Sequence, residues 1–444
     1  MNIKAGSLPD VCADQQSLVL FDAKYRADTW RRRVCLPEFR TDEAKYKFPW
    51  RTQSTSEALA TEELHLPPLD VRAASSSEAT PDLQHPNFAA DTIPLLLYPT
   101  WQENYSHTIS NNIGWLYTHL VKNNASWADM VRLVLYTPHG LPVPKHWPDL
   151  VGGLIPHGLQ SFAEFSARNG NGSRCFQDLI VCTADDMDHS SNVWQAAQHI
   201  AQHYRPTLPD PPLRLITDYS QAVRSESPQA AATVLQVVFA WRDGAAVVQI
   251  TNVEELRLLC SWWFYRCRTT GRLFRAACGT WEFTNLTTSL AVAQRADVLV
   301  GLHGANMANS WFMRPGSSAI EIFPPAWPWD IHRQWLEQDP QLQLRWWGLV
   351  VKDHDAYSPG VLEQEMASRP GLDQGDMAQR KLQRNSNVRV PWAGVERVLE
   401  EVASTWGDRA AYERAVGQHR QLWEVAGGQV RSIPKMPTAA VLTG

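Results

Sequence analysis

The residues with the clearest chemical character lie in one short stretch in the second half of the chain. An apolar run at residues 298–302 ends in His303-Gly-Ala-Asn and is followed by residues that can begin a helix. The length and branching of the run predict a strand buried on both faces. Free amide groups at a helix start favour anions, so a strand, a tight Gly-Ala turn and a helix suit a phosphate-bearing ligand. The candidate contacts for such a ligand are His303, Gly304, Ala305, Asn306 and Asn309.

A second apolar run, at residues 319–323, carries one acidic residue, Glu321. If this run is the next parallel strand, Glu321 lies near the ligand edge of the sheet, where its carboxylate can accept hydrogen bonds from ribose or sugar hydroxyls. The alternatives are a solvated acid at a strand end for Glu321 and a strand end without a ligand for His303. Spacing alone leaves these alternatives open.

The composition limits the class of protein. A chain of 444 residues suggests two or three domains and is long enough to bury a large core. The net charge is −5 and the basic residues are dispersed, apart from Arg31-Arg32-Arg33, so no nucleic-acid partner is expected. No apolar run approaches the roughly 18 residues of a membrane-spanning helix, and the N-terminus lacks a charged start followed by an apolar core. We therefore expect no membrane segment in this chain.

Hydrophobic patterning indicates an α/β protein in two halves. Residues 1–90 show few periodic segments and are expected to form an irregular arm. Residues 91–225 and 226–390 each alternate predicted strands with predicted helices, and a Pro-rich break at 206–212 precedes the second half. Residues 391–444 are predicted to form C-terminal helices and a frayed tail. The individual predictions are strands at 93–98, 131–136, 179–182 and 234–240, helices at 109–121, 253–268 and 286–295, and a surface loop at 142–156.

Seven cysteines leave at least one without a disulfide partner. Cys260 and Cys267 fall on one predicted helix, about 10 Å apart along its axis, which is too far for a direct bridge. Cys12 and Cys35 either form a disulfide or remain reduced thiols, and the sequence does not decide between these. No cysteine spacing is typical of a zinc site.

Four pieces of sequence carry a resemblance to a known family. They are Asn104-Tyr-Ser-His107, then Cys175-Phe176, then Phe239-Ala-Trp-Arg242 through Ile250-Thr-Asn-Val-Glu-Glu-Leu256, and finally His303-Gly-Ala-Asn-Met-Ala-Asn309 with Phe-Met-Arg-Pro-Gly-Ser and Ile-Glu321-Ile-Phe-Pro. In this order, over roughly residues 95–400, they resemble glycosyltransferase family 61. That family includes plant xylosyl- and arabinosyltransferases and animal O-linked N-acetylglucosaminyltransferases.

The resemblance implies a GT-B-like fold, in which two Rossmann-like domains face a central cleft. It implies an inverting transferase that moves a sugar, xylose or N-acetylglucosamine, from a UDP-sugar to a glycan or glycoprotein acceptor. No cofactor and no tightly bound metal are expected. The family's members reside in the lumen of the Golgi or the endoplasmic reticulum, and the acceptor sequons at Asn104, Asn124, Asn171 and Asn285 are compatible with that location.

Sugar transfer needs charge stabilisation on the leaving diphosphate, a grip on the nucleotide and a base for the attacking hydroxyl. With the resemblance, Arg242 is expected to clamp the diphosphate through its planar guanidinium, and a surface salt bridge is the alternative. His107 matches the family's upstream histidine. Because an imidazole titrates near neutrality, His107 is the candidate catalytic base, and a packed, hydrogen-bonded histidine is the alternative.

The chain departs from the family pattern in ways that support other hypotheses. Asn306 stands where the family has a second glycine, and Asn111 and Asn112 occupy a region where the family often has an acid. An amide is not a useful base, so a catalytically inactive glycan- or nucleotide-binding protein is the second hypothesis. A metal-dependent reaction would use Asp186-Met-Asp188 or Asp353-His-Asp355. A dinucleotide-dependent oxidoreductase is disfavoured because no Gly-x-Gly-x-x-Gly follows an early strand.

Overall fold

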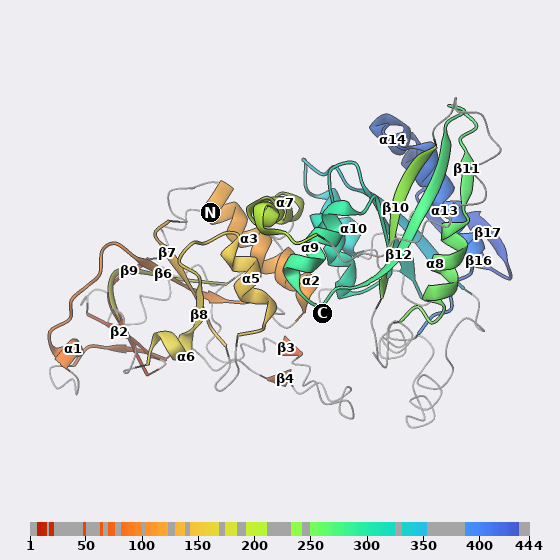
Figure 1. Cartoon of the computed structure of the whole chain (residues 1–444). Coiled ribbons are helices and arrows are strands. Elements are labelled where there is room, and N and C mark those ends of the chain that lie inside the picture. The colour runs from red at the N-terminus through yellow and green to blue at the C-terminus, as the bar shows by residue number, and fades with distance from the viewer. Residues whose placement is uncertain are drawn as a thin grey trace, which may run out of the picture. The chain divides into compact units, whose positions relative to one another are not determined.

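The computed structural model shows two compact units, each of which mixes helices with one large sheet (Figure 1). Unit 1 comprises Met1–His203 with Gln338–Pro340, and unit 2 comprises Tyr204–Glu337 with Gln341–Gly444. The sequence placed the division at 225/226, whereas the units divide between His203 and Tyr204. The described residues are 7–15, 17–21, 48–49, 63–64, 70–75, 81–99, 104–122, 129–137, 143–167, 174–183, 192–210, 232–241, 249–324, 331–352 and 387–434.

The described strands of unit 1 form a seven-stranded sheet with the order β5-β2-β1-β9-β6-β7-β8. Their bounds are β1 Ser7–Asp14, β2 Ser17–Leu20, β5 Asp70–Ala73, β6 Ile93–Tyr98, β7 Val131–Leu135, β8 Leu159–Ser161 and β9 Cys175–Thr183, and a separate pair consists of β3 Phe48–Pro49 and β4 Glu63–Leu64. Strands β9, β6, β7 and β8 are parallel to one another. The predicted strands at 93–98, 131–136 and 179–182 are confirmed.

Strands β1, β2 and β5 fall within residues 1–90, which were expected to be an irregular arm. The reason is visible in β2, because all four of its residues are buried. A strand buried on both faces shows no apolar–polar alternation, which is the usual sign of a strand in a sequence. The N-terminal strands therefore belong to the first sheet and its core.

The helices of unit 1 include one continuous helical run at residues 105–122, where a helix at 109–121 was predicted. It consists of α2 Tyr105–His107, the π-helical turns Thr108–Ile113 and Tyr117–Lys122, and α3 Gly114–Leu116 between them. The other helices are α1 Pro81–Gln84, α5 His146–Gly152, α6 Phe162–Phe165, α7 Val193–Tyr204 and the 3-10 turn Arg205–Thr207. Helix α5 lies where a surface loop was predicted, and it is held by the burial of Trp147, Leu150 and Val151.

The described strands of unit 2 form an eight-stranded sheet with the order β11-β12-β10-β13-β14-β15-β16-β17. The bounds are β10 Thr233–Trp241, β11 Phe264–Arg266, β12 Leu273–Glu282, β13 Val298–Leu302, β14 Ser318–Phe323, β15 Arg345–Val351, β16 Leu422–Ala426 and β17 Gln429–Ser432. The six central strands are parallel to one another, namely β12, β10, β13, β14, β15 and β16. The two edge strands, β11 and β17, are antiparallel to their neighbours. The chain runs from β10 outward to β12 and then returns to β13 on the other side of β10. The carboxyl ends of β10 and β13 therefore flank a topological switch point.

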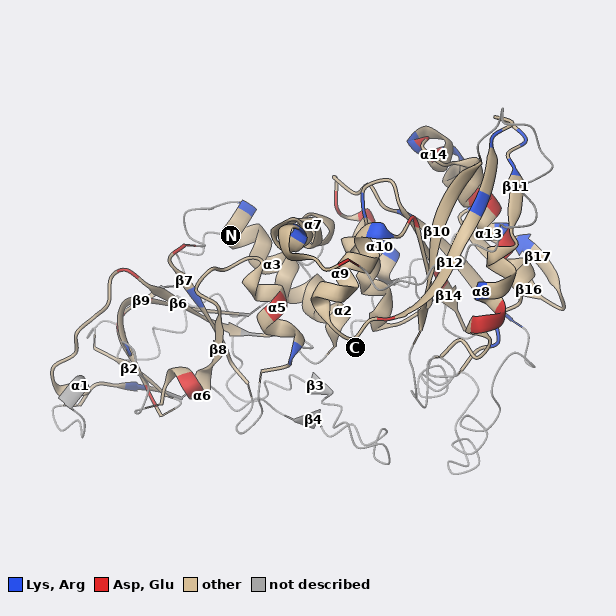
Figure 2. Ribbon diagram, in the orientation of Figure 1, with Lys and Arg blue, Asp and Glu red and all other residues tan. Residues whose placement is uncertain are grey.

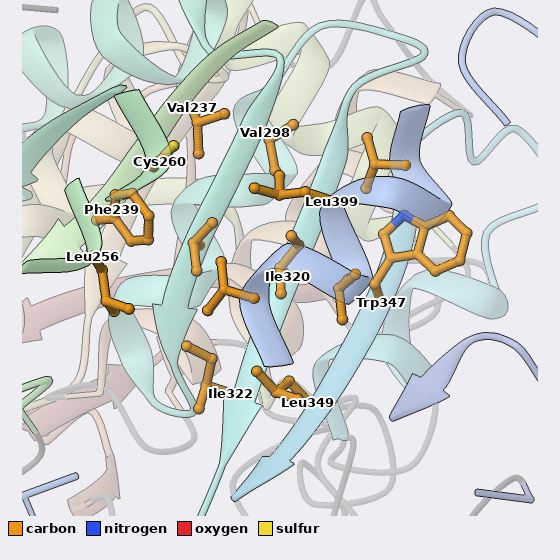
Figure 3. Close-up of a cluster of buried hydrophobic side chains, with 14 of the residues drawn as sticks. Val237, Phe239, Leu256, Cys260, Val298, Ile320, Ile322, Trp347, Leu349 and Leu399 are labelled. Carbon is orange, nitrogen blue, oxygen red and sulfur yellow. The ribbon is translucent and has the colours of Figure 1, made fainter. Parts of the chain in front are cut away.

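The main core of unit 2 lies on one face of this sheet, beneath α8 Val253–Ser261 and α13 Trp392–Ser404. Figure 3 shows Val298 and Ile320 from the sheet beside Leu399 from α13. Because side chains alternate along a strand, the residues between these core positions face the opposite layer. The remaining helices are α9 Leu286–Arg295, the 3-10 helix η8 Ala305–Phe312, α10 Ile331–Glu337 and α14 Arg409–Gly417.

The predicted secondary structure of unit 2 is largely confirmed. The predicted strand at 298–302 and the predicted helix at 286–295 have the bounds of β13 and α9. The predicted helix at 253–268 is wrong in its second half, because α8 ends at Ser261 and β11 follows. The tail was expected to fray, yet β17 pairs with β16 as an edge hairpin.

Two disulfides join pairs of described cysteines, Cys12–Cys175 and Cys260–Cys278. Both alternatives left open for Cys12, a bridge to Cys35 and a reduced thiol, are wrong, because Cys12 is bonded to Cys175. Cys12 and Cys175 lie directly opposite each other in the antiparallel pair β1–β9, a register that a sequence does not reveal. Cys267 is buried without a disulfide partner, in agreement with the expectation that it does not bridge to Cys260.

The described helices include none that is long and apolar enough to cross a membrane.

Gly348 in β15 is a sensitive point of the packing in unit 2. A Cβ atom added there would lie 2.7 Å from Trp346 Cη2 and even closer to Leu422 Cδ1. We expect Gly348→Ala to lower the free energy of unfolding by about 1–3 kcal/mol, because overpacking forces neighbours from their preferred rotamers. Urea denaturation measures the effect. Gly417→Ala is the control, since no atom lies within 4 Å of the added Cβ, and an unchanged stability of Gly348→Ala would contradict the prediction.

Candidate functional site

A pocket lies at the carboxyl ends of β10 and β13, on the two sides of the switch point. Its lining residues are Ala240, Trp241, Gln249, Ile250, Leu302, Gly304, Ala305 and Asn306. In open parallel α/β sheets, ligands bind outside the carboxyl ends of the strands at this type of position. The sequence-predicted residues Gly304, Ala305 and Asn306 are thus at the place where the topology favours a ligand.

The turn from β13 into η8 depends on the backbone of Gly304. This residue has φ 151° and ψ −177°, a region that essentially only glycine adopts. The His303 amide donates to the Ile322 carbonyl oxygen at 2.7 Å, and the Met307 amide donates to the Gly304 carbonyl oxygen at 3.0 Å. Helix η8 therefore begins at the pocket, and the first amides of a helix have no intrahelical acceptor.

Gly301, within β13, lets η8 pack close to the sheet. A Cβ atom added at Gly301 would lie 2.6 Å from Met307 Sδ and 3.0 Å from Ala240 Cβ. The glycine spacing in the sequence thus serves two purposes. Gly301 allows η8 to pack closely against the sheet, and Gly304 permits the backbone turn from β13 into η8.

The side chain of His303 belongs to a buried cluster with Glu321 and His332. His303 Nδ1 lies 2.7 Å and His332 Nδ1 lies 2.6 Å from the same oxygen, Glu321 Oε1. Trp346 Nε1 donates to the other oxygen, Glu321 Oε2, at 2.8 Å. Glu321 is fully buried, and the two imidazoles are nearly so. One carboxylate thus fixes three ring systems, one just after β13, one on α10 and one on β15.

The electrostatics of the cluster favour an ionised Glu321. Burial by itself raises the pKa of Glu321, but the charge of His332 and the hydrogen bonds from His303 and His332 outweigh burial. The pKa of Glu321 therefore lies well below its usual range. An ionised carboxylate only accepts hydrogen bonds, so both Nδ1 atoms carry a proton.

His303, Glu321 and His332 also offer two nitrogens and one oxygen within 4.8 Å of one another, a donor set that metal ions use. A closed structural zinc site needs four ligands. Both carboxylate oxygens accept hydrogen bonds from ring N–H groups. The geometry therefore matches a hydrogen-bonded network that holds His303 in place. The alternative metal-binding residues Asp186, Asp188, Asp353 and Asp355 lie outside the described residues.

The other predicted site residues of unit 2 are placed as follows. Glu321 was expected to meet a ligand at the sheet edge, and it lies instead in the interior behind His303. Asn309 is buried, and its Nδ2 donates to the Asn306 carbonyl oxygen at 2.9 Å, so its side chain braces the first turn of η8. Arg242 lies outside the described residues.

His107, the candidate base, lies in unit 1 at the end of α2 and is half-buried. Asn104 caps α2 by accepting hydrogen bonds from the Ser106 and His107 amides. Asn111 Nδ2 lies 3.5 Å from His107 Nδ1, and the π-helical turn that carries Asn111 and Asn112 buries both. π-Helical turns occur often at functional sites.

Sequence reasoning missed His332 and Trp346 in the cluster, and Trp241, Gln249 and Ile250 in the pocket. Trp241 and Ile250 could have been predicted, because they lie in the same stretch, residues 239–256, whose resemblance to family 61 pointed to Arg242. His332 could not have been predicted, because only the pairing of β13 with β14 and the placement of α10 bring it to Glu321.

Comparison with known proteins gives no further information on this site. The chain matches no protein-family model and no curated protein sequence.

Proposed function

We propose that this protein is an inverting glycosyltransferase that uses a UDP-sugar, with xylose or N-acetylglucosamine as the sugar and a glycan or glycoprotein as the acceptor. One observation carries the nucleotide part, namely the pocket at the switch point of unit 2, lined by the turn Gly304-Ala305-Asn306. The resemblance of the same residues to family 61 supports the sugar-transfer part. The proposal includes a GT-B pairing of the two units.

Within this proposal, each residue type has one task. The amides that begin η8 and the guanidinium of Arg242 stabilise charge on the leaving diphosphate. The Glu321 network holds His303 and with it the end of β13, so that the turn keeps its shape. His107 in unit 1 accepts the proton of the attacking hydroxyl. No tightly bound metal is part of this scheme.

The proposed location is the lumen of the secretory pathway. The two described disulfides are compatible with an oxidising compartment. Asn285, one of the sequon residues, caps α9 by accepting hydrogen bonds from the Thr287 and Thr288 amides.

The first test is binding of UDP. A ligand at about 100 times its Kd stabilises the folded state by about 2.7 kcal/mol, so UDP should raise the melting temperature by several degrees. Ala305→Phe, which fills the pocket, should weaken UDP binding about tenfold or more. Ala163→Phe on the exposed side of α6 is the matched control and should leave UDP binding unchanged.

The second test is transfer from radiolabelled UDP-xylose and UDP-N-acetylglucosamine to glycan acceptors. Transfer that His107→Ala abolishes, with UDP binding retained, is the expected result. A protein that shows no thermal shift with UDP and no transfer with any donor contradicts the proposal.

A specific observation favours one second candidate, a nucleotide- or glycan-binding protein that has lost catalysis. The side-chain amide of Asn111 lies beside His107. An amide cannot accept a proton as a carboxylate at this position would. UDP binding without transfer, in the wild-type protein and in Asn111→Asp alike, would support this candidate. Transfer gained in Asn111→Asp would show that only the base is weakened.

A further inference from the structure

A buried arginine begins strand β15 of unit 2. Arg345 is only 4% exposed, and its Nε and Nη1 atoms have no hydrogen-bond partner among the described residues. The other two buried arginines of the described chain are paired, Arg174 with Asp14 and Arg333 with Glu337. A guanidinium keeps its charge in proteins, and a buried charge is costly unless it is paired. The charge of Arg345 therefore needs a counter-ion.

Two further buried donors lie on the face of the sheet that carries the Arg345 side chain. Trp347 and Leu349 of β15 belong to the core on this face (Figure 3), and the alternation of side chains places Arg345 there too. Ser318 is the register partner of Arg345 on β14 and shares the face with Ile320. Within the described chain, the Trp347 Nε1 and Ser318 Oγ atoms are also buried without a hydrogen-bond partner. The amino ends of β14 and β15 thus present several N–H and O–H donors on one face.

The start of helix α14 lies beside Arg345. The Tyr412 ring meets the Trp347 ring edge-on, with 5.2 Å between their centroids, so α14 packs on the same face. Burial is the largest influence on the pKa of Arg345 and lowers it, and the charge of Arg409 lowers it further. Tyr412 and Asp408 raise this pKa, but too little to compensate. The start of α14 therefore adds positive charge next to Arg345.

The acids of α14 are bonded within α14 itself. Asp408 Oδ1 accepts a hydrogen bond from a backbone amide of the first turn, and Asp408 Oδ2 lies 3.6 Å from Arg414. Glu413 pairs with Arg409 at 3.0 Å. Figure 2 shows charged residues of both signs on this helix. Among the residues that the structure describes, none therefore serves as the counter-ion of Arg345.

We propose that Arg345 and the start of α14 bind a small tetrahedral oxyanion of the phosphate or sulfate type. The planar guanidinium donates parallel N–H bonds to two oxygens of such an ion. The first amides of a helix have no intrahelical acceptor and favour anions as well. Because the donors come from two strands and a helix, they do not lie in one plane, which fits a tetrahedral ion better than a flat carboxylate.

The burial of Arg345 limits the size of the ligand. Its Nε and Nη1 atoms lie beneath the surface, so a long polyanion cannot reach them, whereas a free ion or the phosphate of a small monoester can. Helix α14 is held by two buried side chains, Tyr412 and Ala415, and a small shift of this helix gives access to Arg345. The site lies at the amino end of β15, whereas the pocket proposed for UDP lies at the carboxyl ends of β10 and β13. The anion site is thus independent of the proposed transferase activity.

The test is isothermal titration calorimetry of the full chain with sodium phosphate in a chloride buffer of constant ionic strength. We expect saturable binding of one phosphate per chain, which sulfate competes away. Saturation separates a bound ion from the general stabilisation that phosphate and sulfate give by exclusion from protein surfaces. Glycerol 3-phosphate, titrated in parallel, tells whether the site takes only the free ion or also a phosphate monoester.

Arg345→Met should bind phosphate at least about tenfold more weakly, because it removes a charged donor. In chloride alone this variant should be no less stable than the wild type, because it removes a buried charge that has no partner. Arg409→Gln changes an exposed residue of α14 and should also weaken phosphate binding, so it decides the question if Arg345→Met does not fold. The matched control is Arg257→Met, which removes an arginine that pairs with Glu254 at 2.6 Å and should keep the phosphate affinity.

Ala305→Phe separates this site from the pocket proposed for UDP. This variant should keep phosphate binding, and a loss of that binding would place the phosphate in the pocket and overturn the proposal. So would wild-type phosphate affinity in Arg345→Met, no phosphate binding by the wild type, or acetate binding as tight as that of phosphate. A protein that binds phosphate through Arg345 but does not bind UDP would support the anion site and contradict only the proposed function.

Discussion

Replacing Glu321 by alanine is expected to lower the free energy of unfolding by about 3–5 kcal/mol, the range for removing one partner of a buried charged pair. Glu321 is fully buried and accepts hydrogen bonds from His303, His332 and Trp346. Without its carboxylate, three ring N–H groups remain buried with no acceptor in the cluster, and each carries a desolvation cost. Urea denaturation followed by circular dichroism measures the loss.

The control for Glu321→Ala is Glu413→Ala on α14. Glu413 is 63% exposed and pairs with Arg409 at 3.0 Å. Exposed pairs of this spacing contribute about 0.3–0.5 kcal/mol, so the control should be nearly neutral. A Glu321→Ala protein as stable as the control would show that the cluster does not hold this part of unit 2 together.

The pH dependence gives the same network a second readout. The pKa of Glu321 is lower in the folded state than its ordinary value, so Glu321 stabilises the protein fully above its unfolded-state pKa. This contribution is lost as the pH falls through the folded-state pKa. The difference in stability between the wild type and Glu321→Gln should therefore narrow as the pH falls below about 4.5. A difference that does not narrow below about pH 4.5 contradicts the proposed ionisation of Glu321.

The elements of unit 2 that were predicted from the sequence are those marked by a local pattern of residues. The strand at 298–302 and the helix at 286–295 follow from periodicity and length, and both are confirmed. The turn at Gly304 follows from the small residues after β13, because a glycine there permits a backbone that other residues resist. The position of the pocket required one more step, namely the reversal of strand order between β10 and β13.

Other features depend on contacts between residues far apart in the chain, which no local pattern records. Glu321 was expected at the ligand edge because it is the only acid in an apolar strand. Its partner His332 lies on α10, so the buried network was not foreseeable. The bridge Cys12–Cys175 likewise depends on the register of β1 against β9. The UDP-sugar activity, the base His107 and the role of Arg242 stay predictions.

Replacing Gly304 by alanine is expected to weaken UDP binding at least about tenfold, provided that the pocket binds UDP as proposed. Alanine cannot hold φ 151° and ψ −177° without strain of about 1–3 kcal/mol. The chain will relieve this strain by moving the turn, and the moved residues are Ala305 and Asn306, which line the pocket. Isothermal titration calorimetry with UDP measures the affinity, and urea denaturation measures the accompanying loss of stability.

Gly316→Ala is the matched control because it imposes a similar backbone strain at a different place. Gly316 has φ 85° and no atom lies within 4 Å of an added Cβ, so only the backbone conformation penalises alanine. Gly316 precedes β14, at the amino end of the parallel strands, whereas the pocket lies at their carboxyl ends. Both variants should lose stability, but only Gly304→Ala should lose affinity for UDP. Equal affinities in the two variants would mean that the turn at Gly304 serves the fold of unit 2 and that the nucleotide binds elsewhere.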